Sequence, residues 1–217
     1  MSRAGRRACF ASIADLPEPP DHVGIVVPID HVIPTLRACA ARGVPFATLF
    51  TAGYGETGTE RGRALQAELR AFTQETGLRV MGPNCNGMIN FVTPFAMTST
   101  ATINGPRRPA GDIGVVAQSG GVGQVNVMWR SQEAGLGISY EVSSGNDADL
   151  DLLDFIDFMV EDDVTRVILG GARAHSRRRQ AVPRRASGRR ARQADPGGQA
   201  RPHRGGCARR RVAYPGR

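Results

Sequence analysis

The amino-acid sequence predicts an α/β protein built on open, mainly parallel sheets. Between His22 and Gly171, short runs rich in β-branched residues alternate with segments of helical length. This alternation is typical of parallel strands joined by crossover helices. Glycines also follow two of the expected helices, at Gly43 and Gly77, where a residue without a side chain readily ends a helix.

The first α/β unit covers the chain up to about residue 90. Its expected strands cover residues 23–28, 45–50 and 78–82, and its expected helices cover residues 30–42 and 60–76. Asp30 is the expected N-cap of the first helix. In the second helix, Leu65, Leu69 and Phe72 recur at helical spacing, so one face of this helix is expected to be buried.

A Pro- and Thr-rich connection over residues 91–110 leads to a second unit with the same alternation. Its expected strands cover residues 112–117, 136–142 and 166–171, and its expected helices cover residues 124–134 and 150–160. The pattern stops after Gly171. We therefore expect one domain over residues 1–95, a second over residues 108–171, and a disordered segment over residues 172–217.

Charge is divided unevenly along the chain. The formal net charge is +8, but residues 1–171 hold 13 Arg against 19 Asp or Glu, whereas residues 172–217 hold 15 Arg against one Asp. A basic segment of this kind can bind nucleic acid through counterion release. The body of the chain is mildly acidic, so such binding would depend on the basic segment alone.

The sequence points away from membranes and metal sites. Its four cysteines show neither metal-ligand spacing nor a disulfide framework, which favours a reducing cytoplasm. No run of apolar residues is long enough to span a membrane, and the N-terminus has no signal-peptide core. We therefore expect a cytoplasmic protein without a membrane partner.

The most informative local motif is GDIGVVAQSGGVGQ, residues 111–124. A strand that enters a glycine-rich turn and opens a helix gathers unpaired backbone N–H groups at the positive end of the helix dipole. Ser119, Gly120 and Gly121 are therefore the candidate phosphate cradle, in which Ser119 adds a hydroxyl. The alternative is a turn whose glycines only connect a strand to a helix.

Two further loops each follow an expected strand, where open α/β sheets place ligands. They are TAGYGETG, residues 51–58, and GPNCNG, residues 82–87. Cys85 in the second loop could act as a nucleophile. Because no His stands near it in the sequence, a packed, small apolar side chain is the favoured interpretation.

The loop SSGNDAD, residues 143–149, carries polar side chains at the expected start of a helix. Asn146, Asp147 and Asp149 could bind a metal ion there. Carboxylates at a helix start more often cap the helix, and we expect that role for them.

Six segments, taken in order, resemble the NDP-forming acyl-CoA synthetases, relatives of the succinyl-CoA synthetase α chain. They are SIADLPEPPD, TAGYGETG, LRVMGPNCNGMIN, GDIGVVAQSGGVGQ, VSSGNDADLDLLDFI and DDVTRVIL. The resemblance covers about residues 9–170. It implies a partial Rossmann-like CoA-binding domain followed by a succinyl-CoA ligase-like, flavodoxin-like domain. It also implies that Pro83, Asn84 and Cys85 lie near CoA and that the phosphate cradle holds a phosphoryl group.

The resemblance further implies an acid–CoA ligase of the acetate–CoA ligase type. In that family a carboxylic acid, CoA and ATP or another nucleoside triphosphate give acyl-CoA, NDP and phosphate, through an acyl phosphate and a phosphohistidine. This sequence lacks the family's first strand with its Gly-rich CoA loop, the Ser-His-Thr-Gly-like motif of the phosphohistidine, and the ATP-grasp portion that would bring Mg²⁺. We therefore expect a chain that is inactive alone, with a separate β-type ATP-grasp chain as a candidate partner.

The Arg-rich segment has a second explanation besides nucleic-acid binding. Read one base later with GC-compatible codons, residues 212–215 can give Ser-His-Thr-Pro, which resembles the phosphohistidine motif. A single frameshift near residues 170–172 would account for it, and the coding DNA tests this hypothesis. Three functions stay open: an acid–CoA ligase fragment, a CoA- or nucleotide-binding module or subunit of a split synthetase, and, least favoured, a nucleic-acid-binding protein.

Overall fold

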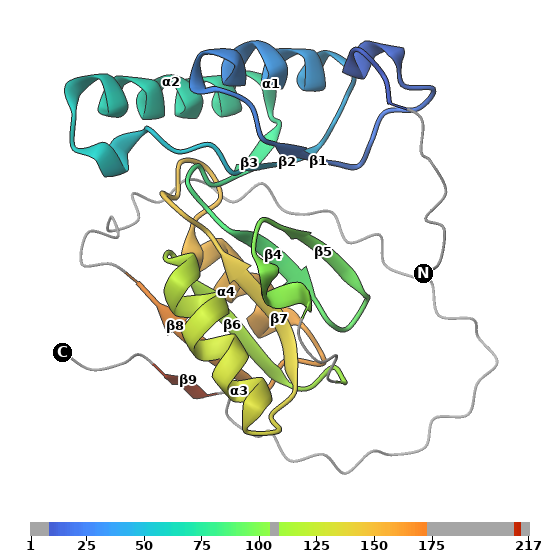
Figure 1. Ribbon diagram of the computed structural model, residues 1–217, viewed down its shortest axis with the longest axis vertical. Coiled ribbons are helices and arrows are strands. Elements are labelled where there is room, and N and C mark those ends of the chain that lie inside the picture. Colours follow the sequence, from blue (N-terminus) through green and yellow to red (C-terminus); the bar gives the residue numbers. More distant parts are fainter. Residues whose placement is uncertain (1–8, 105–108, 173–210, 214–217) are drawn as a thin grey trace, which may run out of the picture.

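The expected α/β class is confirmed, and the strands form two separate sheets (Figure 1). The computed structural model describes residues 9–104, 109–172 and 211–213. A three-stranded sheet has the order β1-β2-β3, and a six-stranded sheet has the order β5-β4-β7-β6-β8-β9. No helix among these residues is long and apolar enough to cross a membrane.

The first sheet is parallel and carries its helices on one face (Figure 1). Its strands are β1 (His22–Ile25), β2 (Phe46–Leu49) and β3 (Arg79–Met81), and its helices are α1 (Val32–Ala41) and α2 (Glu60–Thr76). Short helical turns lie at Ile13–Asp15, Ile29–His31 and Gly55–Thr57. The bounds of α2 agree with the expected helix over residues 60–76, and Gly77 follows it at φ 74°.

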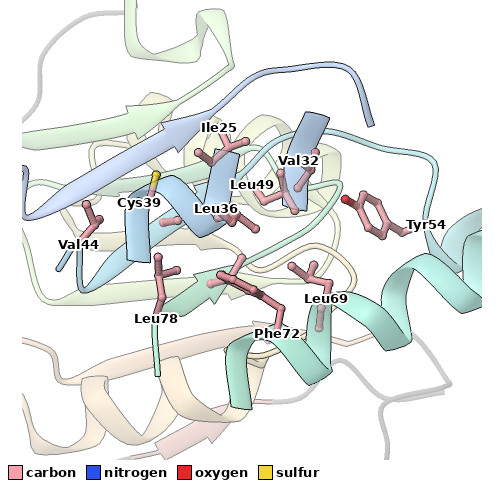
Figure 2. Packing of buried hydrophobic residues seen from close by; sticks show 13 residues of the cluster. Ile25, Val32, Leu36, Cys39, Val44, Leu49, Tyr54, Leu69, Phe72 and Leu78 are labelled. Carbon is pink, nitrogen blue, oxygen red and sulfur yellow. The ribbon is translucent and has the colours of Figure 1, made fainter. Parts of the chain in front are cut away.

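The core of this unit lies between the sheet and its two helices (Figure 2). Leu69 and Phe72 of α2 are buried against Leu36 of α1 and Leu49 of β2. This agrees with the helical spacing of the apolar residues, which turns them all toward the sheet. Full burial of each such side chain stabilises the fold by about 1.5–3 kcal/mol.

The six-stranded sheet has helices on both faces. Its strands are β4 (Gly87–Asn90), β5 (Phe95–Thr98), β6 (Ile113–Ala117), β7 (Ile138–Ser143), β8 (Val167–Gly171) and β9 (Arg211–Ala213). A helical segment over Gly121–Met128 with π-type hydrogen bonds continues into α3 (Trp129–Glu133) on one face, and α4 (Leu152–Glu161) covers the other (Figure 1). A short turn at Ala101–Asn104 precedes β6.

The change from one sheet to the other comes earlier than the expected boundary over residues 91–110. Strands β4 and β5 form an antiparallel hairpin, and β4 pairs with β7 of the second sheet, Gly87 opposite Ser143. The chain therefore leaves the first sheet after Met81. The Pro- and Thr-rich composition correctly indicated the turn and the loop around this hairpin. It did not indicate that β4 pairs with β7, which lies about fifty positions later in the sequence.

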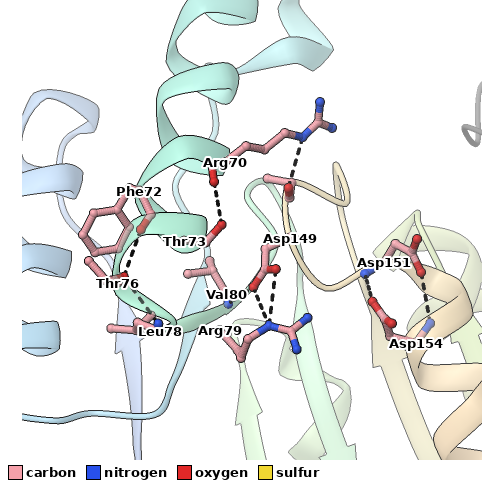
Figure 3. Close-up of polar contacts among 11 residues, drawn as sticks. Arg70, Phe72, Thr73, Thr76, Leu78, Arg79, Val80, Asp149, Asp151 and Asp154 are labelled. Atoms are coloured by element: carbon pink, nitrogen blue, oxygen red, sulfur yellow. Dashed lines mark hydrogen bonds and ion pairs between the residues drawn. The ribbon is translucent and has the colours of Figure 1, made fainter. Parts of the chain in front are cut away.

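Two expected helix starts differ from the structure. Asp30 is not the N-cap of α1, because a short helical turn precedes the helix and Asp30 instead pairs with Arg61 at 2.9 Å. Helix α4 is capped by Asp151, whose side chain accepts from the N–H of Asp154 while Asp154 bonds back to the N–H of Asp151 (Figure 3). This reciprocal pair satisfies two N–H groups at the helix start.

Of the segment expected to be disordered, the structure describes Ala172 and strand β9. Strand β9 pairs in parallel with β8, from Val167 opposite Arg211 to Leu169 opposite Ala213. The expectations of disorder and of a shifted reading frame otherwise fall on residues 173–210 and 214–217, which lie outside the described residues.

Candidate functional site

Four loops singled out in the sequence meet at the carboxyl ends of the parallel strands. The backbone N–H of Asn84 donates to the carbonyl of Thr51 at 3.1 Å, which joins the loops after β3 and β2. The N–H of Asn146, after β7, donates to the carbonyl of Pro83 at 2.9 Å, and that of Ser144 donates to the carbonyl of Ala117 at the end of β6 at 3.0 Å. Ligands of open α/β proteins bind at this edge.

The backbone of the GPNCNG loop is tightly fitted to the loop after β7. The Gly82–Pro83 peptide bond is cis, and Asn84 has a left-handed backbone with φ 55°. Gly145 approaches so closely that an added Cβ would lie 2.3 Å from the carbonyl oxygen of Pro83. With φ 72° at Gly145 as well, only glycine fits this position without strain.

Asn146 is the polar centre of the site and joins both sheets. Its amide nitrogen donates to Oε1 of Gln66 at 3.2 Å and to Oε2 of Glu56, and its side-chain oxygen accepts from the amide of Asn84 at 3.3 Å. Glu56 and Gln66 belong to the first sheet's unit, so one side chain ties three loops together. The sequence favoured a helix cap at Asn146, but in the structure its side chain bonds to Asn84 and Glu56, which lie 62 and 90 positions away.

Glu56 closes the TAGYGETG loop on itself. Its Oε1 accepts from the backbone N–H of Gly53 at 2.6 Å and of Tyr54 at 3.3 Å. Burial acts to raise the pKa of Glu56, but the hydrogen bonds from Gly53 and Asn146 outweigh it and hold the pKa below its ordinary value. Glu56 is therefore ionised at neutral pH and presents an acceptor to Asn146.

The phosphate cradle exposes backbone where a helix begins. The N–H groups of Val122 and Gly123 donate to the carbonyl of Ser119 at 3.1 and 2.9 Å. In the part of the chain that the structure describes, the N–H groups of Gly120 and Gly121 have no such acceptor. Two free donors at the positive end of a helix suit an oxyanion.

Gly120 also joins the cradle to the GPNCNG loop. An added Cβ at Gly120 would lie 2.1 Å from Nδ2 of Asn86, whereas one at Gly121 would have no atom closer than Oγ of Ser119 at 3.9 Å. Asn86 in turn donates its N–H to Oγ of Ser143 at 3.1 Å. The structure thus brings the expected CoA loop and the expected phosphate cradle into contact, and Asn86 is a contact that sequence analysis missed.

Asp147 lies behind the cradle with an unusual backbone. One carboxylate oxygen accepts from the amide of Gln118, the residue before Ser119. Burial raises the pKa of Asp147, and the hydrogen bond from Gln118 offsets part of this effect. Asp147 at φ 56° and Asn84 are the two non-glycine residues with positive φ in the described ranges, and such outliers cluster at functional sites.

Cys85 has the properties of a structural residue. Its side chain is 5% exposed, and its thiol donates to the carbonyl of Leu49 at 3.4 Å. Burial raises the pKa of the Cys85 thiol to about 12. A thiol that stays protonated and covered is a poor nucleophile, which fits the interpretation favoured from the sequence.

Asp149 was expected to cap α4, but in the structure it joins the two sheets. Its Oδ2 accepts from the N–H of Val80 in β3 at 2.8 Å and from Nε of Arg79 at 3.0 Å (Figure 3). Nearby, Nε of Arg70 donates to the carbonyl of Ala148 at 3.0 Å. The loop after β7 therefore holds the first sheet by both its backbone and its side chains.

The described residues contain no group of three or more His, Cys, Asp or Glu side chains placed to hold a metal ion. Asn146, Asp147 and Asp149 each have protein partners instead. The candidate site is thus built from loops, whose polar groups are mainly backbone N–H donors and side-chain amides.

Comparison with known proteins matches both halves of the chain. A family model described as "CoA binding domain" matches residues 2–90, and one described as "Succinyl-CoA ligase like flavodoxin domain" matches residues 110–182. The second match extends past Gly171, where the strand and helix alternation ends.

Curated relatives include an ADP-forming acetate–CoA ligase I of Archaeoglobus fulgidus. It is 38% identical over 161 residues, which are 74% of this chain and 23% of that protein. The α subunit of the ADP-forming acetate–CoA ligase I of Pyrococcus furiosus is 33% identical over 161 residues, 74% of this chain and 33% of that protein. The chain thus spans a quarter to a third of the length of these relatives.

A solved structure has the same fold. It is that of a dinucleotide forming acetyl-coenzyme A synthetase 1 of Ca. Korarchaeum cryptofilum in complex with phosphate and ADP, with a TM-score of 0.66 and 34% sequence identity. The superposed part covers 75% of this chain and 33% of that one.

Proposed function

Since this chain belongs to the NDP-forming acyl-CoA synthetases, the family of the ADP-forming acetate–CoA ligases, we propose that it performs the CoA- and phosphate-binding part of an acid–CoA ligase reaction. The substrates would be CoA and a carboxylic acid, or the acyl-CoA in the reverse direction. Pro83 and Asn84 would contact CoA, and Ser119, Gly120 and Gly121 would hold the phosphoryl group.

One observation carries this proposal: Gly120 of the phosphate cradle packs directly on Asn86 of the GPNCNG loop. Acyl transfer between phosphate and the CoA thiol requires both groups at one point, with the reacting atoms about 3 to 3.5 Å apart. Contact between the proposed CoA loop and the proposed phosphate cradle supports this arrangement, because ligands bound at the two would lie side by side. The free N–H groups of Gly120 and Gly121 would stabilise charge on the phosphoryl oxygens.

Cys85 would support CoA binding indirectly. Its buried thiol donates to the carbonyl of Leu49, so it would hold the GPNCNG loop against β2. Pro83 and Asn84 belong to the same loop and would present the amide of Asn84 and its neighbouring backbone to the ligand.

The remaining steps would need groups from elsewhere. In the family's reaction a phosphohistidine passes its phosphoryl group between the nucleotide and an acyl phosphate, with ATP and Mg²⁺ at an ATP-grasp portion. The relatives from Pyrococcus furiosus are named as α subunits, which supports a separate partner chain here. We propose that this chain alone forms no acyl-CoA.

Calorimetric titration of CoA into the full chain tests the proposal. Asn84→Gly removes the amide and keeps the left-handed backbone that glycine adopts freely, and it is expected to weaken CoA binding by about tenfold or more. Asn90→Ala is the matched control, because Asn90 pairs with Tyr140 at the opposite end of β7. The proposal would be contradicted if the folded wild-type chain does not bind CoA. It would also be contradicted if Asn84→Gly binds CoA as tightly as wild type.

The nucleic-acid alternative has its own measurement. If the chain binds nucleic acid, fluorescence anisotropy with a DNA duplex of arbitrary sequence would show an affinity that falls steeply as the salt concentration rises. Deletion of residues 172–217 would abolish it. CoA binding that survives the deletion would separate the two functions.

A further inference from the structure

One buried ionisable group has no part in the proposed function: Glu141, in the middle of β7. Its side chain is 0% exposed. Neither carboxylate oxygen has a hydrogen bond of good geometry among the described residues, although the amide of Gln124 lies close enough to lower the pKa of Glu141. A buried carboxylate without partners is energetically unfavourable when ionised, so its presence calls for an explanation.

Glu141 lies directly beneath the first turn of the helix that begins at the phosphate cradle. An added Cβ on Gly123 would lie 3.0 Å from Oε1 of Glu141. In the sheet, Glu141 pairs with Val115 of β6 and Ile89 of β4, which belong to an apolar cluster with Met128. The carboxyl group is therefore enclosed between apolar strands and the start of this helix.

The surrounding elements supply almost no charge. Strands β4 and β6 and the helix Gly121–Met128 contain no Asp, Glu, His, Lys or Arg. The thiol of Cys85 is the titratable group that senses the charge of Glu141, and its own pKa of about 12 keeps it neutral. Burial raises the pKa of Glu141 to about 8, and the nearby amide of Gln124 offsets part of this effect.

We propose that Glu141 carries the proton that accompanies a divalent oxyanion into the phosphate cradle. The inference rests on the proposed function, because it takes Ser119, Gly120 and Gly121 as the anion site. An ionised Glu141 and a bound phosphoryl group would compete for the positive end of one helix and repel each other in a region of low dielectric. By linkage, the bound anion favours protonated Glu141, and loss of that proton weakens anion binding.

Sulfate is the probe for this coupling, because its charge stays constant from about pH 6.5 to about pH 9.5 and phosphate's does not. Sulfate binding to the full chain is measured by calorimetry across that range for three proteins: wild type, Glu141→Gln and Glu161→Gln. Glu161 is an exposed acid at the end of α4, so its variant controls for the loss of one charge. We expect wild type and Glu161→Gln to bind sulfate about tenfold more weakly at the alkaline end.

The Glu141→Gln variant is expected to bind sulfate equally well at both ends of the range. A wild-type affinity that does not change with pH, or a Glu141→Gln variant that keeps the wild-type slope, would overturn the role of Glu141 and leave the cradle intact. If sulfate does not bind at any pH, the assignment of the phosphate cradle as an anion site is contradicted, and so is its coupling to Glu141.

Nuclear magnetic resonance of wild-type protein with ¹³C-labelled glutamate provides the second measurement, which holds even if Glu141→Gln does not fold. Saturating sulfate is expected to move the titration midpoint of the Glu141 carboxyl to higher pH. A midpoint that stays in place with sulfate bound would sink the proposal.

Discussion

The carboxylate of Asp149, in the loop after β7, accepts a hydrogen bond from the backbone N–H of Val80 in β3 at 2.8 Å. Val80 lies in the first sheet, whereas Asp149 lies in a loop that follows a strand of the second sheet, 69 positions later in the sequence. Because this contact stands beside the bridge between Met81 and Leu150, it continues the hydrogen bonding of β3 into the second unit. The candidate site lies at this junction.

Replacement of Asp149 by Ala is expected to lower the free energy of unfolding by about 1.5–3 kcal/mol, because a hydrogen bond to a charged group is lost. Urea unfolding followed by circular dichroism measures the change. Asp163→Ala is the control, since Asp163 is exposed in the turn after α4, and it is expected to change stability by less than about 0.5 kcal/mol. Equal effects of the two variants would show that the junction contributes nothing.

Gly120→Ala is expected to destabilise the protein by about 1–3 kcal/mol through overpacking. Its new methyl group would meet the side chain of Asn86. Gly121→Ala introduces the same group into open space, so it should leave stability unchanged or raise it by about 0.5–1 kcal/mol. Thermal unfolding distinguishes the pair. Asn86→Gly should rescue Gly120→Ala, because the Cβ that Asn86→Ala would keep lies 2.7 Å from the new methyl group. Similar melting temperatures for both single variants would contradict the packing of Gly120 on Asn86.

Cys85 is expected to resist alkylation in the native protein. Its thiol is buried and its pKa is raised to about 12, so the reactive thiolate is scarce at about pH 8. Cys9 is exposed and provides the internal control. After brief treatment with iodoacetamide, peptide mass spectrometry should show label on Cys9, with label on Cys85 only after denaturation. Rapid native labelling of Cys85 would revive its interpretation as a nucleophile.

Glu56 is expected to contribute a pH-dependent part of the stability. Its folded pKa is below the ordinary value because the hydrogen bonds from Gly53 and Asn146 outweigh burial. This contribution is therefore present above the ordinary pKa of about 4.5 and is lost as the pH falls through the lower folded value. Urea unfolding between about pH 6 and pH 3 should show a flatter profile for Glu56→Gln than for wild type. Glu18→Gln, an exposed loop residue, should follow the wild-type profile.

The sequence predicted the local elements well where the signals were local. The spacing of Leu69 and Phe72 predicted the buried face of α2, and the glycine at position 77 predicted its C-terminal end. The hairpin of β4 and β5 escaped prediction because each strand has four residues and β4 pairs with residues 140–143, far along the chain. Local periodicity carries no information about such a partner.

The candidate site shows the same division. The QSGGVG and GPNCNG motifs marked the candidate phosphate cradle and its neighbouring loop, because backbone freedom at glycine is visible in a sequence. The links through Asn146 to Glu56 and Gln66 depend on tertiary approach and left no local signal. Glu141 does have a local signal in the sequence. It is the single charged residue of β7, whose other residues are Ile, Val, Tyr and two Ser.

The pairing of β4 with β7 also determines where this protein can be divided for expression. A cut near residue 95, after the hairpin has begun, would give an N-terminal fragment in which β4 is unpaired. In the C-terminal fragment, β7 would keep β6 but lose β4, its other neighbour. Unpaired strands of this kind recruit other chains and aggregate. A cut between Met81 and Gly87 keeps each sheet whole, but it divides the GPNCNG loop, so independent expression of the halves would separate folding from ligand binding.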